Sequence, residues 1–160
     1  MIDNEPALNV LRKYLGLKAG EAVSNTEQFP LLLTREDGNT VVRAPGILNQ
    51  DDSIIFPGIM PEGSKIRFAV SPGSEMLNQT KLKLKGFRQL HPDSDAALVF
   101  DCDGRLLALG ADVEEETRAV ADLWNKPSLG FFTFGEFGPF DTGLCDFHQY
   151  TLSIVLIREK

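Results

Sequence analysis

The 160-residue chain has few of the residues from which metal sites and disulfide scaffolds are built. It contains two cysteines, Cys102 and Cys145, and two histidines, His91 and His148, and neither cysteine lies in a Cys-x-x-Cys motif. A structural zinc site and a disulfide framework are therefore poorly supported. No apolar run approaches the roughly 20 residues that cross a bilayer, and the N-terminus lacks a signal-peptide pattern. These absences predict a reduced, cytoplasmic protein without membrane contact.

Basic charge is also scarce. Sixteen Lys and Arg residues stand against 23 Asp and Glu residues, which gives a formal net charge of −7. Binding to nucleic acid rests mainly on clustered Lys and Arg side chains. The one basic cluster, residues 81–88, is short and is better explained as a solvated helix face. Nucleic acid is therefore not an expected partner.

The composition is otherwise that of an ordinary globular protein. Hydrophobic residues make up 42% of the chain, and eleven Phe against one Trp and two Tyr predict a dry interior filled by phenylalanine. The length suits one core, and no repeat, low-complexity tract or linker divides the sequence. We therefore expect a single domain over residues 1–160.

The pattern of apolar residues predicts an α+β fold with a mainly antiparallel β-sheet packed with helices. Helical spacing marks residues 4–15, 74–89 and 114–124, the last with acidic residues in its first turn. An Asp37-Gly38 turn between residues 29–34 and 40–43 predicts an antiparallel hairpin. Further strands are expected at 53–56 and 65–70, joined by a turn at 61–64 into a second hairpin, and at 96–100, 131–134 and 147–157.

The last third of the chain carries the strongest candidate site. An aromatic and glycine run at residues 131–139 surrounds Glu136, and residues 145–151 then supply a thiol, His148 and Thr151. Glycines on both sides of Glu136 allow a sharp turn and a close approach, and aromatic neighbours would fix its direction by packing. We therefore expect the Glu136 carboxylate to be held rather than solvated.

These segments resemble the C-terminal domain of FIST proteins, named for F-box and intracellular signal transduction. The family pairs a Cys-x-x-Arg segment after an apolar strand with an aromatic-Gly-Glu segment and a final strand opening on His-Asn-x-Thr. The matching segments are residues 41–43, 52–56, 59–64, 101–105, 131–139 and 145–151. The chain departs from the family pattern at Gln149, where Asn is usual, and at Phe134, where Tyr is frequent.

The resemblance implies a non-catalytic domain of intracellular signalling that senses an amino-acid-like small molecule. The F-box members imply an alternative, a scaffold that recruits proteins. FIST proteins ordinarily carry a separate N-terminal half, so this chain is expected to be a piece of a longer protein or a short gene product completed by a partner. An exposed apolar face would favour a homodimer.

Two arginines are candidate anion contacts for such a ligand. Arg105 follows a buried strand, where its donors suit a carboxylate, and an ion pair with Glu136 is the structural alternative. Arg43, in the second predicted strand, is a further candidate. We predict that Arg105 and Glu136 approach each other, because a buried charge needs a partner.

His148 and Cys102 have weaker claims. His148 is either a hydrogen-bond anchor, which we expect, or an axial haem ligand, since haem binding has been attached to some FIST proteins. Cys102 is a small hydrophobe at a strand end or, less readily, a nucleophile activated by His148. The predicted ligand-binding residues are Arg105, Glu136, His148, Cys102, Arg43 and Thr151, with no cofactor, no metal and no catalytic residue.

Overall fold

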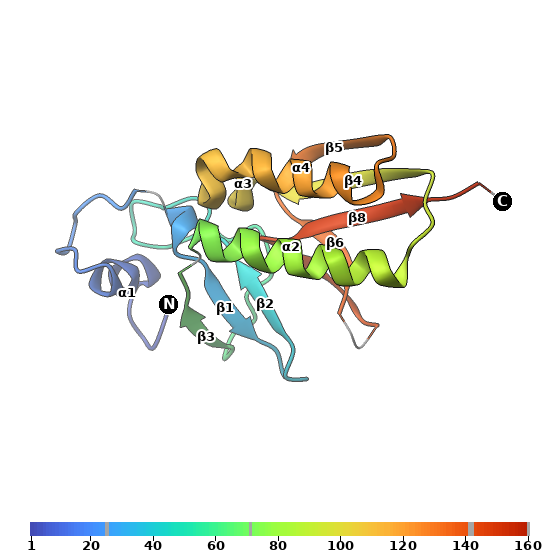
Figure 1. The fold of residues 1–160 in the computed structure, drawn as a ribbon. Helices are drawn as coiled ribbons and strands as arrows, with labels where there is room; N and C mark the ends of the chain where they lie inside the picture. Colours follow the sequence, from blue (N-terminus) through green and yellow to red (C-terminus); the bar gives the residue numbers. More distant parts are fainter. Residues whose placement is uncertain (25, 71, 141–142, 160) are drawn as a thin grey trace. The chain divides into compact units, whose positions relative to one another are not determined.

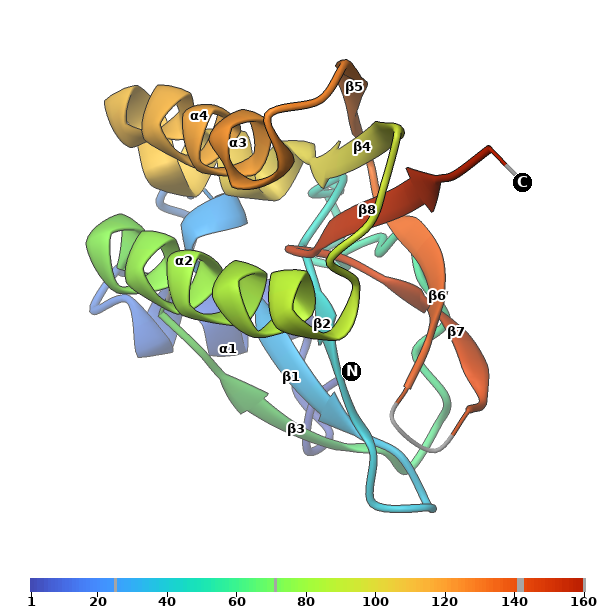
Figure 2. The same ribbon diagram turned by 45° about the vertical axis from the view of Figure 1, so that its right-hand side comes forward.

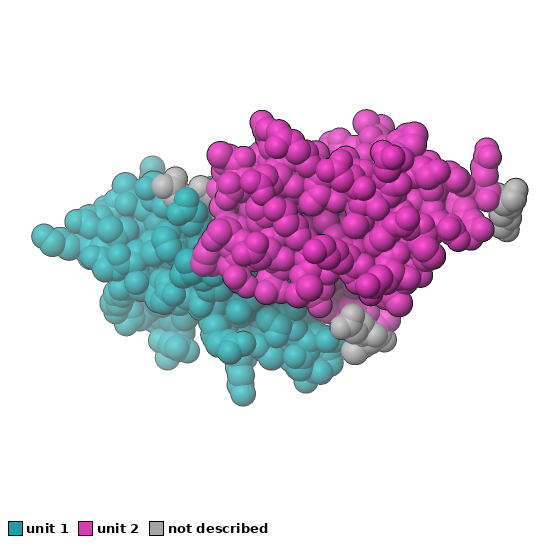
Figure 3. All heavy atoms as spheres, viewed as in Figure 1, with its two compact units in different colours: residues 1–70 teal, residues 71–160 magenta. Residues whose placement is uncertain are grey.

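The computed structural model describes residues 1–24, 26–70, 72–140 and 143–159. The chain folds as two compact units, Met1–Val70 and Ser71–Lys160 (Figure 3). Among the described residues, none of the helices combines the length and the apolar character that a membrane span requires.

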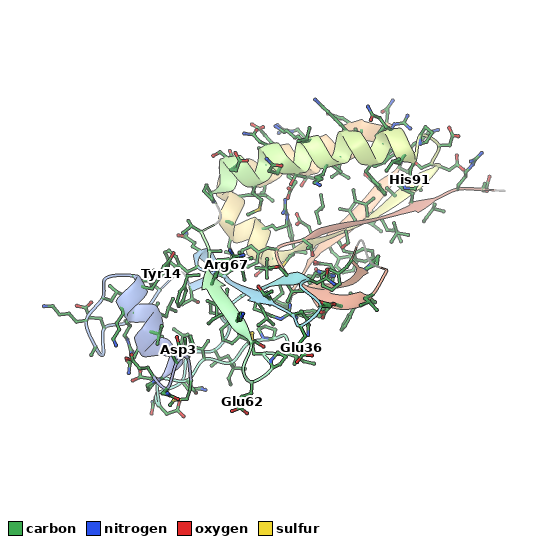
Figure 4. The ribbon with its side chains drawn as sticks, turned by 90° about the horizontal axis from the view of Figure 1, so that it is seen from below. Asp3, Tyr14, Glu36, Glu62, Arg67 and His91 are labelled. Carbon is green, nitrogen blue, oxygen red and sulfur yellow. The ribbon has the colours of Figure 1, made fainter. Side chains whose placement is uncertain are left out.

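Unit 1 combines one helix with a three-stranded antiparallel sheet. Helix α1 (Ala7–Tyr14) buries Leu8 and Leu11, and the chain leaves it through Gly16, whose φ of +71° suits glycine. The sheet has the order β2-β1-β3, with β1 (Leu31–Thr34), β2 (Thr40–Arg43) and β3 (Lys65–Phe68). A short 3₁₀ turn, η1 (Thr26–Gln28), precedes β1. Tyr14 stacks on Phe68 at 4.3 Å between ring centroids (Tyr14 is labelled in Figure 4).

The first predicted hairpin is confirmed, and the second is wrong. β1 and β2 pair across the Asp37-Gly38 turn as expected. Residues 53–56 form no strand; Ile54 makes only an isolated bridge to Leu48, and β3 pairs with β1 instead. Pro57 follows this segment directly and has no N–H to continue a ladder, whereas β1, with two alternate residues buried, pairs on both of its edges.

Unit 2 places helices on one side of a mixed sheet. Its helices are α2 (Gly73–Leu90), α3 (Asp103–Leu109) and α4 (Val113–Trp124), with a short 3₁₀ turn, η2 (Gly110–Asp112), between the last two. The sheet has the order β5-β4-β8, with β4 (Ala96–Cys102) parallel to β5 (Ser128–Thr133) and antiparallel to β8 (Leu152–Ile157). The three helices pack on one another and lie together beside this sheet (Figure 2).

The single long strand expected at residues 147–157 is two strands. β7 (Cys145–His148) pairs with β6 (Glu136–Pro139) in a separate hairpin, and β8 joins the larger sheet. Tyr150 lies between them with φ of +60°, outside the extended region, so the chain turns there from one sheet to the other. Across the described residues, four of the five strand pairings are antiparallel, and the α+β prediction holds.

The interior differs from the prediction of a phenylalanine-filled core. None of the eleven phenylalanines, all of which lie among the described residues, is buried. The buried hydrophobic residues are mainly aliphatic, with Leu11, Leu33 and Val41 the most enclosed in unit 1. In unit 2 the core side chains include Leu84, Val120 and Trp124. Most of the phenylalanines are instead in or next to strands, where one face of a sheet is often only partly covered.

One face of the larger sheet in unit 2 is apolar and open. Strand register places Leu98 beside Leu129 and Val155, Phe100 beside Phe131, and Ala96 beside Ile157. The rings of Phe100 and Phe131 meet edge to face at 5.3 Å. Exposure is 71% for Leu129, 62% for Phe131, 50% for Val155 and 44% for Ile157. We refer to these side chains as the open face; the helices lie against the opposite one, which carries Val99 and Asp101.

Candidate functional site

Arg105 is the centre of the polar cluster in unit 2. It is almost fully buried on α3, a helix that was not predicted from the sequence. Its guanidinium donates hydrogen bonds to both carboxylate oxygens of Glu116, to the carbonyl oxygen of Tyr150 at 3.1 Å and to the hydroxyl of Thr80 at 2.6 Å. Four of its five N–H groups are used in this way.

Two carboxylates share this one guanidinium. Glu116, from α4, is 1% exposed, and Asp101, from β4, lies with its Oδ1 atom 3.3 Å from Nε of Arg105. Burial and, next, the neighbouring Glu116 carboxylate together raise the pKa of Asp101 to about 7, although Arg105 opposes the rise. A carboxyl group with this pKa holds a proton about half of the time at neutral pH.

Glu136 is held by hydroxyl groups. It is the first residue of β6 and is buried, and its two carboxylate oxygens accept hydrogen bonds from the hydroxyls of Thr133 and Thr151. The ion pair with Arg105 that was the structural alternative is not formed, because the charge partners of Arg105 are Asp101 and Glu116. The expectation that Glu136 is held rather than solvated is confirmed, with threonines in place of the guanidinium.

The glycine before Glu136 does what the sequence predicts. Gly135 has φ of +144°, and a Cβ built there would lie 2.3 Å from the ring of Phe147. Only glycine fits at this contact. The aromatic packing expected around Glu136 is wrong, because Phe134 and Phe137 are both largely exposed.

Cys102 lies beside Thr151 in a dry environment. Its N–H donates to the carbonyl oxygen of Thr151 at 3.0 Å, and the residue is 2% exposed. Burial raises the pKa of the Cys102 thiol, although backbone N–H groups of Tyr150 and Gly104 oppose the rise. A raised pKa keeps sulfur in the thiol form, which is the opposite of what a nucleophile requires.

His148 is tied to its own hairpin. Its Nε2 atom lies 2.9 Å from the carbonyl oxygen of Gly138, so this nitrogen carries the hydrogen and donates it. The ring also meets Phe140 edge to face at 4.9 Å. Gln149, at the position where the family has Asn, is buried and donates from Nε2 to the carbonyl oxygen of Phe134 at 3.3 Å.

Arg43 belongs to unit 1, whereas the other candidate residues belong to unit 2. It is fully buried on β2, and it donates from Nη1 to the carbonyl oxygen of Val42 at 3.0 Å and from Nε to that of Ile59 at 3.4 Å. Gly58 lies flat against the guanidinium, since a Cβ built there would stand 2.5 Å from Nε. These contacts give Arg43 a packing role within its own unit.

Unit 2 contains a cavity of about 500 Å³ between α2 and β8, the two elements that run side by side in Figure 1. Its walls are largely apolar. The lining residues are Met76, Gln79, Thr80, Lys83, Leu84, Phe87, Arg105, Tyr150, Thr151, Leu152 and Ile154. Arg105 and Thr151 are the predicted ligand-binding residues that reach this lining; Glu136, His148 and Cys102 are not part of it.

Most polar groups on the cavity wall already have partners. The hydroxyl of Thr80 donates to the carbonyl oxygen of Met76 at 3.0 Å, and that of Thr151 donates to Glu136. Lys83 differs, because among the described residues no carboxylate is paired with its ammonium group, while Lys81 on the same helix is paired with Glu115 at 2.7 Å. Lys83 therefore supplies an available positive charge at the cavity.

Asp101, Glu116 and Lys83 were not predicted from the sequence. Glu116 carried a signal, because it lies three residues after Val113 and four before Val120, on the inner stripe of its helix. It was grouped instead with its exposed neighbours as a complement to the helix dipole. Asp101 stands next to Cys102 in the segment that carries the family resemblance, yet nothing in its spacing separates it from a solvated residue.

The family model named FIST C domain matches residues 7–139. The chain therefore belongs to the FIST C domain family. Searches of the curated proteins and of the solved structures find no match. The match spans parts of both compact units and includes Arg105, Glu116 and Glu136, while His148 and Thr151 lie beyond it. FIST C domains are associated with signal transduction, so this chain carries a signalling domain.

Among the described residues, no group of three or more His, Cys, Asp or Glu side chains is arranged to hold a metal ion.

Proposed function

We propose that this FIST C domain is a non-catalytic sensory module of cytoplasmic signal transduction that binds an amino-acid-like molecule in the cavity between α2 and β8. The observation that carries the proposal is a cavity of about 500 Å³ with apolar walls and an available ammonium group at Lys83. Ligand pockets are typically of 300–1,000 Å³, mainly apolar, with a small number of polar groups that orient the ligand.

The chemistry of the lining favours a carboxylate attached to an apolar body. The ammonium group of Lys83 and the fifth N–H of Arg105, which has no acceptor among the described residues, are donors for a carboxylate. Leu84, Phe87 and Ile154 offer surface for an apolar side chain. A carboxylate would be attracted weakly by Arg105 itself, because Asp101 and Glu116 already offset that charge, so Lys83 carries most of the attraction.

The thiol chemistry argues against an enzyme. Burial raises the pKa of Cys102, and the ring nitrogen Nε2 of His148 is engaged with Gly138. The thiol therefore stays protonated, and the imidazole nitrogen is already hydrogen-bonded, so the two residues do not form the activated thiol–imidazole pair that thiol catalysis needs.

The test is a thermal-shift and calorimetric titration of the whole chain with a panel of free amino acids. We expect apolar amino acids such as leucine and phenylalanine to raise the melting temperature, with a stabilisation of about 2.7 kcal/mol at a concentration of 100 Kd. Lys83→Ala should weaken binding at least tenfold. Lys85→Ala is the matched control, since Lys85 is on the same helix but outside the cavity lining. Equal binding by both variants, or none by the wild type, would contradict the proposal.

The open face supports a second candidate function, contact with protein, and we propose a second copy of this chain as its occupant. Monomers rarely expose contiguous apolar patches of more than a few hundred Å². Because the net charge is −7, two copies that met through most parts of their surface would bring like charges together. The open face is different, since none of the paired strand residues on that face carries a charged side chain. Two such faces packed on a two-fold axis would form a sandwich with an apolar interior.

Sedimentation velocity over a range of protein concentrations tests this second candidate. We expect the wild type to dimerise and Phe131→Glu to remain monomeric. Phe137→Glu is the control, because Phe137 is 78% exposed but belongs to β6, outside the open face. A wild type that stays monomeric at high concentration would exclude the homodimer, and dimerisation lost equally in both variants would place the contact elsewhere.

A further inference from the structure

We propose that the free edge of strand β5 pairs with the same edge in a second copy of this chain, so that the three-stranded sheets of two copies of unit 2 join side by side. β5 is an end strand of its sheet, and β4 is its one strand partner among the described residues (Figure 2). This contact uses the edge of the sheet, whereas the second candidate function uses its open face. The inference therefore does not depend on the proposed function.

Three residues of β5 direct their backbone groups away from β4. The N–H of Ala97 donates to the carbonyl oxygen of Pro127 at 3.0 Å, and Ala97 lies beside Ser128 in the parallel register. In a parallel ladder this pattern turns the N–H and C=O groups of Ser128, Gly130 and Phe132 outward. Within the described ranges these outward groups form no hydrogen bond, and all three residues are exposed. Free groups of this kind are a template for pairing with another strand.

Neither face of β5 is well covered. On the open face, Leu129 is 71% exposed and Phe131 is 62% exposed. On the helix side, Phe132 is 44% exposed, and a cavity of about 180 Å³ lies between the strand and α4. This cavity is smaller than the cavity between α2 and β8. A strand that is exposed at its edge and on both faces is accessible to a second strand.

β5 also lacks the features that usually prevent an edge strand from pairing, which are charged residues, prolines and bulges. Its sequence, Ser-Leu-Gly-Phe-Phe-Thr, contains no charged residue and no proline. The smaller hairpin is protected, because β6 ends at Pro139 and β7 contains Asp146. β8 has no such residue, but α2 lies beside it across the larger cavity. β5 is therefore the edge in unit 2 that is best suited to pair.

A second β5 strand fits this edge because the outward groups are spaced evenly about Gly130. An antiparallel pair centred on Gly130 sets this glycine opposite its own copy and Ser128 opposite Phe132 of the second copy. Each outward N–H then meets an outward C=O of the other strand. The same register sets Leu129 opposite Phe131 of the second copy in a close pair without hydrogen bonds, so two exposed apolar side chains cover each other.

Charge also favours a second copy as the occupant. The net charge of −7 opposes contact between two copies through most of their surface, but β5 carries no charged residue. Antiparallel pairing keeps Leu129 and Phe131 of both copies on the same side of the joined sheet, so the two open faces form one continuous apolar surface. A two-fold axis relates the strands, which closes this contact at two chains.

Disulfide trapping with the whole chain tests both the contact and its register. Every chain carries Cys145→Ser, which removes the exposed thiol, while the thiol of Cys102 is buried. Leu129→Cys and Phe131→Cys are made in separate chains, which are oxidised alone and as an equal mixture. Opposite residues of a pair without hydrogen bonds have Cα atoms about 4.5 Å apart, within the reach of a disulfide. We expect the mixture to give a disulfide-linked heterodimer, identified by its mass.

Either chain alone should give about tenfold less cross-linked product, because equal residues of the two copies lie diagonally, about 7–8 Å apart. Two open faces packed against each other would be about 10 Å apart, which is too far for a disulfide. The heterodimer therefore reports the edge contact whether or not the open faces pack together.

A further variant blocks the edge directly. Ser128→Pro, added to both cysteine chains, removes an outward N–H and leaves the hydrogen bonds to β4 in place, since proline is accepted at the first residue of an edge strand. It should lower the yield of heterodimer about tenfold, whereas the control Ser128→Ala should leave the yield unchanged. The comparison of the mixture with the single chains still decides if Ser128→Pro fails to fold. No heterodimer, equal cross-linking of either chain alone, or an unchanged yield in a folded Ser128→Pro variant would overturn the inference.

Discussion

The carboxylate of Glu116 accepts two hydrogen bonds from the guanidinium of Arg105, and this buried ion pair joins helix α4 to helix α3. Helix α2 is joined to the same guanidinium through Thr80, and the segment between β7 and β8 through the carbonyl oxygen of Tyr150. One arginine thus connects four parts of unit 2.

Removal of Arg105 should be strongly destabilising. Arg105→Leu leaves two buried carboxylates without a cation, and breaking such a pair costs about 3–5 kcal/mol. Glu116→Gln should cost less, because Asp101 remains as the anion beside the guanidinium. Urea unfolding followed by circular dichroism measures both changes. Arg118→Ala, which removes an exposed ion pair with Glu114, should change the free energy of unfolding by less than about 0.5 kcal/mol.

Asp101 should make the protein less stable as pH rises from about 4 to about 7. Its pKa in the folded chain is about 7, above the ordinary value of 3.8, so between these values the folded state holds a proton that the unfolded state has released. The stabilisation that this proton gives is complete below pH 4 and is lost as pH rises through 7. Melting temperatures of the wild type and Asp101→Asn across this interval test it, and parallel curves would show that Asp101 does not titrate there.

Glu136→Ala should lower stability without altering ligand binding. Its carboxylate holds Thr133 and Thr151, and loss of these contacts should cost about 1–3 kcal/mol. The residue is not part of the lining of the larger cavity, so the melting-temperature increment from an amino acid should be unchanged. A weaker increment is the result expected if Glu136 binds the ligand, as the sequence predicts, and it would return Glu136 to the binding site.

His148 should not bind haem. Its Nε2 nitrogen donates to Gly138, and an axial bond through that atom would require the hydrogen bond to break. This prediction rests on the hydrogen bond alone. The phenylalanine-filled interior expected from the sequence would have left no space for haem, but that interior is absent. Titration with hemin should give no stoichiometric change in the Soret band. A saturating shift that disappears in His148→Ala would make the protein a haem-based sensor.

The sequence predicted local features well and long-range partners poorly. The Asp37-Gly38 hairpin, the helix at 114–124 and the strand at 96–100 all follow from patterns confined to a few neighbouring residues, although the strand is only partly buried. Helix α3 was missed because Asp103-Gly104 resembles a turn, whereas in the fold Gly104 packs closely on Tyr150, with a Cβ position only 3.0 Å from its ring. Such packing depends on a contact between residues that are far apart in the sequence.

Charge pairing was equally hard to predict. Arg105 and Glu136 both follow apolar strands, and a rule that buried charges find partners pointed to a pair between them. Each of the two residues does have a partner, but the two do not pair with each other. Hydroxyl groups of Thr133 and Thr151 donate hydrogen bonds to Glu136, and Glu116 on helix α4 is the anion beside Arg105. Sequence shows that a partner is needed, but only the fold decides which one is within reach.

The left-handed conformation of Tyr150 gives unit 2 a mechanical link between its two sheets. Tyr150 lines the larger cavity, its carbonyl oxygen is held by Arg105, and the residue next to it, Thr151, is bonded to Glu136 at the start of the hairpin. A tyrosine at φ of +60° sits in a conformation that costs about 1–2 kcal/mol, so the surrounding contacts must hold it there. The wall of the larger cavity and the connection between the two sheets of unit 2 are therefore formed by the same residue, so a substitution at Tyr150 should alter both together.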